Sequence, residues 1–210
     1  MLFSFNSKYL PKYEINIKCD QILHKKAFDI CYNYKWKTPK IVIYRLYKKL
    51  INKNNYSRKN LRFKPDYNIP IKFRSYNKDY SKTGYDRGHL APNGAFDYNK
   101  TIQKETFLLS NIAPQKPRLN RKLWAKIERF TRFQAIKYKK ISVITGVCKS
   151  LGKIKNNINI PKWWYKIIFI PNGKIISFLV PNSNYVGKDK IRKYLVDFKE
   201  IEKKCNFKIR

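Results

Sequence analysis

Two histidines are the first candidates for chemistry in this sequence, because imidazole is the side chain that exchanges a proton near neutral pH. His24 lies among lysines, with no acid or amide beside it in the sequence, as is typical of a surface histidine. His89 follows Asp86, Arg87 and Gly88, so an acid, a guanidinium group and a glycine directly precede it. We therefore expect His89 to act as a general base that takes a proton from an attacking water molecule.

Downstream of His89, one predicted helix carries three further polar candidates. Residues 119–136 place apolar side chains at the spacing of a buried helix face, at Leu119, Leu123, Ile127 and Phe130. At about 100° per residue, Glu128 and Arg132 lie roughly 80° and 120° around the helix axis from Asn120, so all three can border one side. They offer an amide oxygen for a hard cation, a carboxylate for its water molecules and a guanidinium for phosphate. Taken singly, the same residues fit a helix N-cap, a surface charge and its solvated partner.

Hydrophobic patterns also predict the elements that must position these residues. Apolar runs predict strands at 39–46, 141–147, 164–170 and 174–180. The last two runs flank Pro171-Asn172-Gly173, whose residue types favour the tight turn of a β-hairpin. A second helix is predicted near 189–204, and the Lys/Asn-rich residues 48–60 are predicted to form an exposed loop. Because strands outnumber helices, we expect an α+β fold with a central, mostly antiparallel sheet flanked by helices.

The charge of the chain points to a polyanionic partner. Its 210 residues suffice for one well-buried domain, and 48 Lys and Arg against 13 Asp and Glu give a net charge of +35. Such an excess attracts nucleic acids or anionic lipid surfaces, although a general bias toward Lys, Asn, Ile and Tyr explains part of it. No apolar run approaches the roughly 18 residues that span a bilayer. We therefore expect no membrane insertion.

The cysteines Cys19, Cys31, Cys148 and Cys205 do not have the Cys-x-x-Cys spacing of a zinc site. Cys19 and Cys31 bracket a short segment and can form a disulfide in an oxidising compartment. Four unpaired, partly buried thiols are the alternative, and the sequence alone leaves both open.

The central segments resemble a known family. The chain contains DRGH at 86–89, SNIAPQ at 110–115 and LNRKLWAKIER at 119–129. These segments are similar to those of the DNA/RNA non-specific endonuclease family, whose members have a ββα-metal (His-Me finger) active site. Weaker similarity extends to residues 58–66, 144–147, 160–169 and 180–182. The resemblance thus implies a nuclease domain at residues 39–210, preceded by an N-terminal extension, residues 1–38, that packs on the core.

The family resemblance assigns a role to each residue of the reacting centre. It makes His89 the general base and Asn120 the direct protein ligand of Mg²⁺, which Mn²⁺ or another divalent cation can replace. Glu128 would hold a metal-bound water molecule, and Asn111 would orient the site near His89. The cofactor that the resemblance implies is therefore a single hard cation with few protein ligands.

The resemblance also implies a set of phosphate-binding arginines. Arg87 and Arg132 would contact phosphate, and Arg58 is the candidate for a further arginine that stabilises the transition state. Arg62 lies in the same segment and competes with Arg58 for that role. Asp86 would brace the motif, and Gly88 would permit a close turn.

Taken together, the resemblance implies a Mg-dependent, sugar-non-specific endonuclease. It would hydrolyse phosphodiester bonds in single- and double-stranded DNA and RNA, leave 5′-phosphate ends, and exist as a monomer or homodimer. A site that handles only phosphate and metal does not need to read the 2′-hydroxyl or the base edges. The alternative is a catalytically inactive, basic nucleic-acid-binding protein of the same fold. Residues 19–34 resemble the leading segment of exported bacterial members, which favours a periplasmic or secreted protein, whereas no signal peptide is visible.

Overall fold

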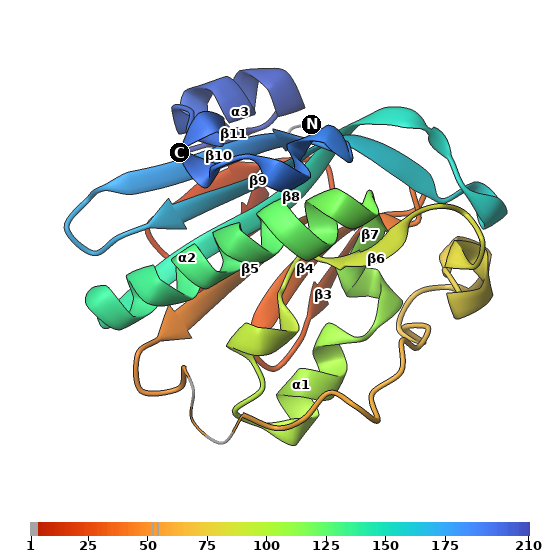
Figure 1. The fold of residues 1–210 in the computed structure, drawn as a ribbon, viewed down its shortest axis with the longest axis horizontal. Coiled ribbons are helices and arrows are strands. Elements are labelled where there is room, and N and C mark those ends of the chain that lie inside the picture. The colour runs from red at the N-terminus through yellow and green to blue at the C-terminus, as the bar shows by residue number, and fades with distance from the viewer. Residues whose placement is uncertain (1–3, 52, 54) are drawn as a thin grey trace.

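The computed structural model describes residues 4–51, 53 and 55–210, and a six-stranded antiparallel sheet forms its centre (Figure 1). Every neighbouring pair in the order β10-β9-β8-β5-β4-β3 is antiparallel. The strands are β3 (Gln21–His24), β4 (Phe28–Asn33), β5 (Thr38–Tyr47), β8 (Lys140–Lys153), β9 (Asn159–Phe169) and β10 (Ile175–Pro181). The expected α+β class with a mostly antiparallel sheet is confirmed, as are the four predicted strands.

The hairpin between β9 and β10 forms where the turn residues predicted it. Phe169 pairs with Ile175 across the turn, and Gly173 has a positive φ of 86°, a conformation that L residues with a Cβ rarely adopt. Local turn chemistry therefore sets the register of these two strands.

Two apolar clusters cover the two faces of the main sheet. Alternation along β5 directs Val42 and Tyr44 into the cluster that contains the helix α2 (Ala125–Lys137). Ile41 and Ile43 point into the other cluster. This second cluster lies under α3 (Phe198–Cys205) and a small sheet of β1 (Ser4–Asn6), β2 (Glu14–Asn16) and β11 (Lys208–Ile209). Each fully buried aliphatic side chain contributes about 1.5–3 kcal/mol.

The two predicted helices are present, but each begins differently from the expectation. The helix predicted at 119–136 opens as a π-helical segment, Leu119–Trp124, and continues as α2. The helix predicted near 189–204 begins later than expected, at Phe198. Residues Ile191–Tyr194 form a separate 3-10 turn, and α3 begins only after Asp197, whose side chain accepts a hydrogen bond from the Lys199 amide as an N-cap.

The remaining elements are short. A two-stranded sheet contains β6 (Asp86–His89) and β7 (Ile112–Gln115), and α1 spans Lys100–Thr106. Further 3-10 turns lie at Ile71–Phe73, Asn77–Tyr80, Asn93–Ala95, Leu109–Asn111, Lys155–Asn157 and Tyr185–Lys188. The predicted loop at 48–60 contains no helix or strand among its described residues, and its residues 52 and 54 lie outside the described part. None of the described helices has the length and apolar character needed to cross a membrane.

The N-terminal residues contribute strands to the main sheet. The boundary predicted between residues 38 and 39 falls inside β5, and β4 is hydrogen-bonded to β5 along its length. The division into an extension and a nuclease domain stays a prediction, and in the structure β3 and β4 continue the same sheet.

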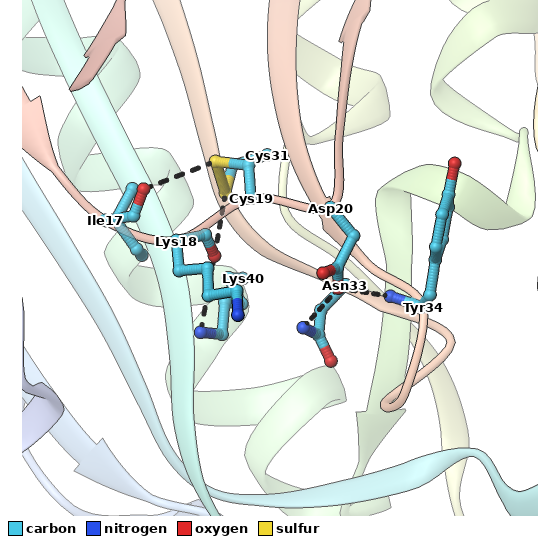
Figure 2. The surroundings of a disulfide bond; sticks show 8 residues. All are labelled: Ile17, Lys18, Cys19, Asp20, Cys31, Asn33, Tyr34 and Lys40. Atoms are coloured by element: carbon cyan, nitrogen blue, oxygen red, sulfur yellow. Dashed lines mark hydrogen bonds between the residues drawn. A yellow bond between two sulfur atoms is a disulfide. The ribbon is translucent and has the colours of Figure 1, made fainter. Parts of the chain in front are cut away.

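Both cysteine pairs form disulfides. Cys19 is bonded to Cys31 and Cys148 is bonded to Cys205, so the alternative of four unpaired thiols is wrong. The first disulfide joins the segment after β2 to β4, with Lys18 and Lys40 close by (Figure 2). The second joins β8 to the last residue of α3. The second pair was beyond prediction because its members lie 57 residues apart.

Candidate active site

The β6–β7 hairpin carries the DRGH segment. Asp86 pairs with Gln115 and His89 pairs with Ile112. Gly88 lies in the strand β6, so the expected close turn at this residue is wrong. Its role is close packing, because a Cβ there would lie 2.5 Å from Gln115 Oε1 and 2.7 Å from the Trp164 ring. A side chain at position 88 would therefore push the hairpin away from β9.

Asn111 holds the chain just after His89. Its Oδ1 accepts a hydrogen bond from the Ala91 amide at 2.8 Å. Its Nδ2 donates to the carbonyl oxygens of Ala91 and Thr106, both at 2.9 Å. The side chain is fully buried and makes these three bonds to backbone groups. Asn111 therefore fixes the backbone of the loop that follows His89. It does not line the pocket described below.

His89 is held between aromatic rings. The imidazole centroid lies 5.3 Å from the Phe63 ring and 5.2 Å from the edge-on Phe107 ring. Its Nε2 is buried and has no hydrogen-bond partner among the described residues. Burial, together with the charge of Arg58, lowers the pKa of His89 to about 3. The imidazole is therefore neutral near pH 7 and can accept a proton.

Asp86 organises the start of the π-helical segment. Its Oδ2 accepts hydrogen bonds from Asn120 Nδ2 at 2.9 Å and from Arg121 Nε at 2.8 Å. Its Oδ1 accepts one from Arg121 Nη2 at 2.7 Å. Partial burial opposes ionisation of Asp86, but these bonds outweigh it and lower the pKa. Because Nδ2 of Asn120 is bound to Asp86, the amide oxygen Oδ1 points to the other side of the amide group.

Aromatic rings also hold two of the arginines. Arg87 Nη2 donates to the Asn77 carbonyl at 2.7 Å, and its guanidinium lies over Phe63 and Tyr80 at 5.6 and 5.5 Å from the ring centroids. The Arg58 guanidinium lies 5.3 Å from the Phe107 centroid. Neither arginine forms an ion pair with a described carboxylate. Their positive charge is therefore available to an anion.

A pocket of about 530 Å³ brings the predicted site residues together. Its walls come from β6, from the 3-10 turn at Asn93–Ala95, from the π-helical segment and α2, and from the segment that contains Arg58. Arg58 and Arg62 were the two candidates for the arginine that stabilises the transition state. Arg58 lines the pocket and Arg62 does not. The predicted site residues among its lining are Arg58, Arg87, His89, Asn120, Glu128 and Arg132.

A buried lysine, which was not singled out from the sequence, interacts electrostatically with Glu128 although it does not line the pocket. Lys166 on β9 is fully buried, and its Nζ donates to Tyr44 Oη at 2.8 Å and to Thr145 Oγ1. Burial lowers its pKa to about 7. Burial raises the pKa of Glu128, and the charge of Lys166 opposes this rise. The available signal was a lysine in the middle of the otherwise apolar segment WYKIIF.

The other histidine is outside the pocket, as expected. The His24 side chain is 68% exposed, which confirms the surface assignment. No acid lies beside His24 in the sequence, but in the folded chain Asp29 Oδ1 lies 2.8 Å from its Nδ1. The two residues are opposite each other in the β3–β4 ladder, a proximity that only the strand pairing creates.

A metal site in this pocket would depend mainly on oxygen atoms from amide and water. Within the described ranges, no group of three or more His, Cys, Asp and Glu side chains is arranged to hold a metal ion. Asn120 Oδ1 and the Glu128 carboxylate remain as oxygen donors on the pocket wall. This sparse set suits a hard cation that keeps most of its water molecules.

Comparisons with known proteins agree with this architecture. A mitochondrial nuclease of Saccharomyces cerevisiae is 38% identical over 124 residues, which cover 59% of this chain and 38% of that protein. Nuclease C1 of Cunninghamella echinulata var. echinulata is 33% identical over 159 residues, covering 68% of this chain and 63% of that protein. A chain from the crystal structure of the EndoG/EndoGI complex superimposes with a TM-score of 0.85 at 27% identity, covering 91% of this chain and 86% of that chain.

The alignments with these two relatives span less than two thirds of each relative's length. The family model for DNA/RNA non-specific endonucleases matches residues 6–210, almost the whole chain. The chain therefore belongs to the DNA/RNA non-specific endonuclease family.

Proposed function

We propose that this protein is a metal-dependent endonuclease that hydrolyses phosphodiester bonds in single- and double-stranded DNA and RNA. The observation that carries the proposal is one pocket in which a neutral His89, five arginines, among them Arg58, Arg87 and Arg132, and the Asn120 amide meet. A base, cations for phosphate and an oxygen donor for a hard metal are the groups that phosphodiester hydrolysis needs.

His89 acts as the general base in this proposal. Its imidazole is neutral near pH 7 because burial and Arg58 disfavour the protonated form. The neutral ring has a nitrogen lone pair that can take the proton from a water molecule that attacks the phosphorus atom, and the lowered pKa makes it a weaker base than a solvent-exposed histidine. The rings of Phe63 and Phe107 limit the positions that the imidazole can adopt, and Asn111 fixes the backbone that follows it.

The arginines stabilise the negative charge that the attack concentrates on the phosphoryl oxygens. Arg87 and Arg132 bind the phosphate, and Arg58 stabilises the negative charge that develops on the phosphoryl oxygens in the transition state. Recognition in this proposal is through phosphate and metal, and it does not require contact with the 2′-hydroxyl or the base edges. Indifference to the sugar follows from this mode of recognition.

Mg²⁺, or Mn²⁺ or another divalent cation in its place, would neutralise charge on the phosphate and lower the basicity of the departing 3′ oxygen, which leaves a 5′-phosphate end. Asn120 Oδ1 would be its direct protein ligand and Glu128 would hold one of its water molecules. The fit is chemical: Asp86 binds the Asn120 amide nitrogen, which leaves an amide oxygen, the ligand type that Mg²⁺ prefers.

The test uses plasmid DNA and RNA, each with Mg²⁺ and with EDTA. We expect Mg²⁺-dependent loss of both substrates with the unmodified chain and none with His89→Ala, which should still bind nucleic acid in a mobility-shift assay. Binding without cleavage by the unmodified chain would instead support the inactive, basic nucleic-acid-binding protein. Activity of His89→Ala would refute the general-base assignment. The monomeric or homodimeric state stays a prediction, which light scattering of the purified chain measures.

A further inference from the structure

A second basic groove lies on the α3 side of the main sheet, away from the active-site pocket. Its volume is about 790 Å³. Three separate parts of the chain line it: the segment after β2, the start of β5, and the residues from α3 to the end of the chain. In Figure 1, α3 and β11 lie together at the top, and α2 lies below them. The cations of this groove are Lys18, Lys40, Lys199, Lys203, Lys208 and Arg210.

A β-bulge brings Lys40 into this groove. The ladder between β4 and β5 passes from Ile41 to Pro39, so Lys40 has no partner on β4. A bulge of this kind changes the direction of the side chain relative to simple alternation. Lys40 Nζ donates to the Lys18 carbonyl at 3.5 Å, and Figure 2 shows the two lysines next to each other. The sheet is thus locally distorted in a way that places two cations together.

Covalent bonds and strand pairing hold the walls of the groove in place. The Cys19–Cys31 disulfide follows Lys18 directly, and the Cys148–Cys205 disulfide precedes Asn206, another lining residue. The C-terminal strand β11 pairs with β2. A ligand therefore meets side chains on fixed backbone, which reduces the entropy lost on binding.

The positive charge of the groove is largely uncompensated. Glu202 is the carboxylate among its lining side chains. It accepts a hydrogen bond from the Ile209 amide at 2.6 Å and pairs with Lys208 at 3.6 Å, so it stabilises the C-terminal strand. The other five cations form no ion pair with a described carboxylate. Burial lowers the pKa of Lys40 most, Asp20 opposes the shift, and Lys18 adds a smaller lowering effect. The excess of cations over carboxylates in the groove favours an anionic ligand.

We propose that this groove binds the phosphodiester backbone of a nucleic acid at a site separate from the active-site pocket. The cations come from three segments and most are exposed, an arrangement that matches a row of phosphates better than a single one. The apolar lining residues Ile17 and Phe207 are 8% and 3% exposed, so neither can insert into a bilayer or stack on a base. Binding is therefore through charge and indifferent to sequence. A long substrate held at both sites dissociates more slowly than one held at the active site alone.

The test reverses two exposed groove charges, Lys18→Glu with Lys199→Glu, in a His89→Ala chain whose disulfides are intact. Position 199 is in the first turn of α3, where a glutamate is favourable to the helix. Fluorescence anisotropy then measures binding to a long DNA duplex at several salt concentrations. Each lost phosphate contact lowers the slope of log K against log salt by about 0.9. Two lost contacts predict a slope smaller by about two and binding about thirtyfold weaker near 0.15 M salt.

The matched control is Lys48→Glu with Lys49→Glu, two exposed lysines that line neither site. They lie beyond the opposite end of β5 from Lys40, roughly 25 Å away at the rise of a strand. The proposal predicts less than about a threefold loss for this control. Equal losses in the two variants, or no loss in the groove variant, would overturn it.

Two further measurements distinguish the groove from a membrane-binding surface and from the active-site pocket. Loss of binding to phosphatidylserine vesicles with unchanged DNA binding would overturn the proposal in favour of a membrane surface. With His89 intact, the groove variant should cleave a short oligonucleotide, which fills only the active-site pocket, within about twofold of the unmodified rate. Binding does not depend on cleavage. A chain that binds as expected but cleaves nothing therefore supports the groove while refuting the proposed function.

Discussion

The bond between Asp86 and Asn120 makes a quantitative prediction about metal binding. Asp86 is 16% exposed and accepts Asn120 Nδ2 at 2.9 Å. An Asn amide can rotate by half a turn, and within the described part of the chain the hydrogen bond to Asp86 distinguishes its two orientations. A hydrogen bond to a charged group is worth about 1.5–3 kcal/mol, so Asp86 favours the orientation with Oδ1 away from it by roughly 10- to 150-fold.

Replacing Asp86 with alanine removes this preference. We expect the Mg²⁺ concentration for half-maximal cleavage to rise by about 10- to 100-fold, the usual effect of losing a partner that orients a metal ligand. The rate at saturating Mg²⁺ should recover in part, because His89 and the arginines remain. Asp86→Asn retains an acceptor oxygen without the charge, so its effect should be intermediate. Plasmid cleavage measured over a Mg²⁺ titration gives both quantities.

Arg121→Gln provides the matched control. Arg121 donates to the same carboxylate, but its side chain is 68% exposed, and the Asp86–Asn120 bond survives its replacement. The Mg²⁺ requirement should therefore stay within about threefold of the unmodified value. If Asp86→Ala lowers the rate but leaves the Mg²⁺ requirement unchanged, Asp86 does not act through the metal ligand and the reasoning fails.

Three further predictions follow from burial and covalent structure. Because the pKa of His89 is lowered to about 3, the acid limb of the cleavage rate in a pH series should lie well below the ordinary value of 6.5, and a limb near pH 6.5 would contradict this environment. Burial disfavours the charged form of Lys166 in the folded state and lowers its pKa to about 7. The free energy of unfolding in urea should therefore rise from about pH 7 toward pH 10. A Lys166→Met chain that keeps the same rise would exclude this residue as its source. Replacing Cys148 and Cys205 with serine should lower the free energy of unfolding by about 4 kcal/mol, because this disulfide closes a 57-residue loop. Replacing Cys19 and Cys31 should lower it by about 3 kcal/mol, because that disulfide closes a 12-residue loop. A larger loss for Cys19 and Cys31 in thermal unfolding would show that loop entropy does not decide their effect.

The parts of the fold that local chemistry determines were predictable from the sequence. The β9–β10 hairpin follows from Pro171-Asn172-Gly173, since these residues specify the turn without help from the rest of the chain. The helix at 119–137 follows from its apolar spacing. Its π-helical start was not predictable, because the spacing of apolar residues does not distinguish one wide turn from an ordinary one. The start of α3 was placed too early for a related reason: the Asp197 cap overrides an apolar pattern that extends before it.

The pocket was predictable only as a set of residue types. His89, Asn120 and Glu128 were singled out from motifs and spacing, and the structure brings them into one pocket. Lys166 was not singled out because its interaction with Glu128 exists only once the main sheet packs against α2. The Lys40 bulge has the same origin, since a one-residue shift between two strands has no local signature.

The scarcity of acids helps to keep Arg58 and Arg87 free of ion pairs and available to a phosphate. The chain has 13 acidic residues against 48 basic ones, and several acids already hold the fold, such as Glu202 at the C-terminal strand and Asp86 at Asn120. Arg58 and Arg87 are instead positioned by the faces of Phe107, Phe63 and Tyr80, and Arg87 also donates one hydrogen bond to the neutral Asn77 carbonyl. A ring attracts a guanidinium by only about 0.5–2 kcal/mol and leaves its donors free. A carboxylate partner would fix the arginine equally well, but a phosphate would first have to displace it. Positioning by aromatic rings therefore orders these cations without neutralising them, which is what a site for a polyanion requires.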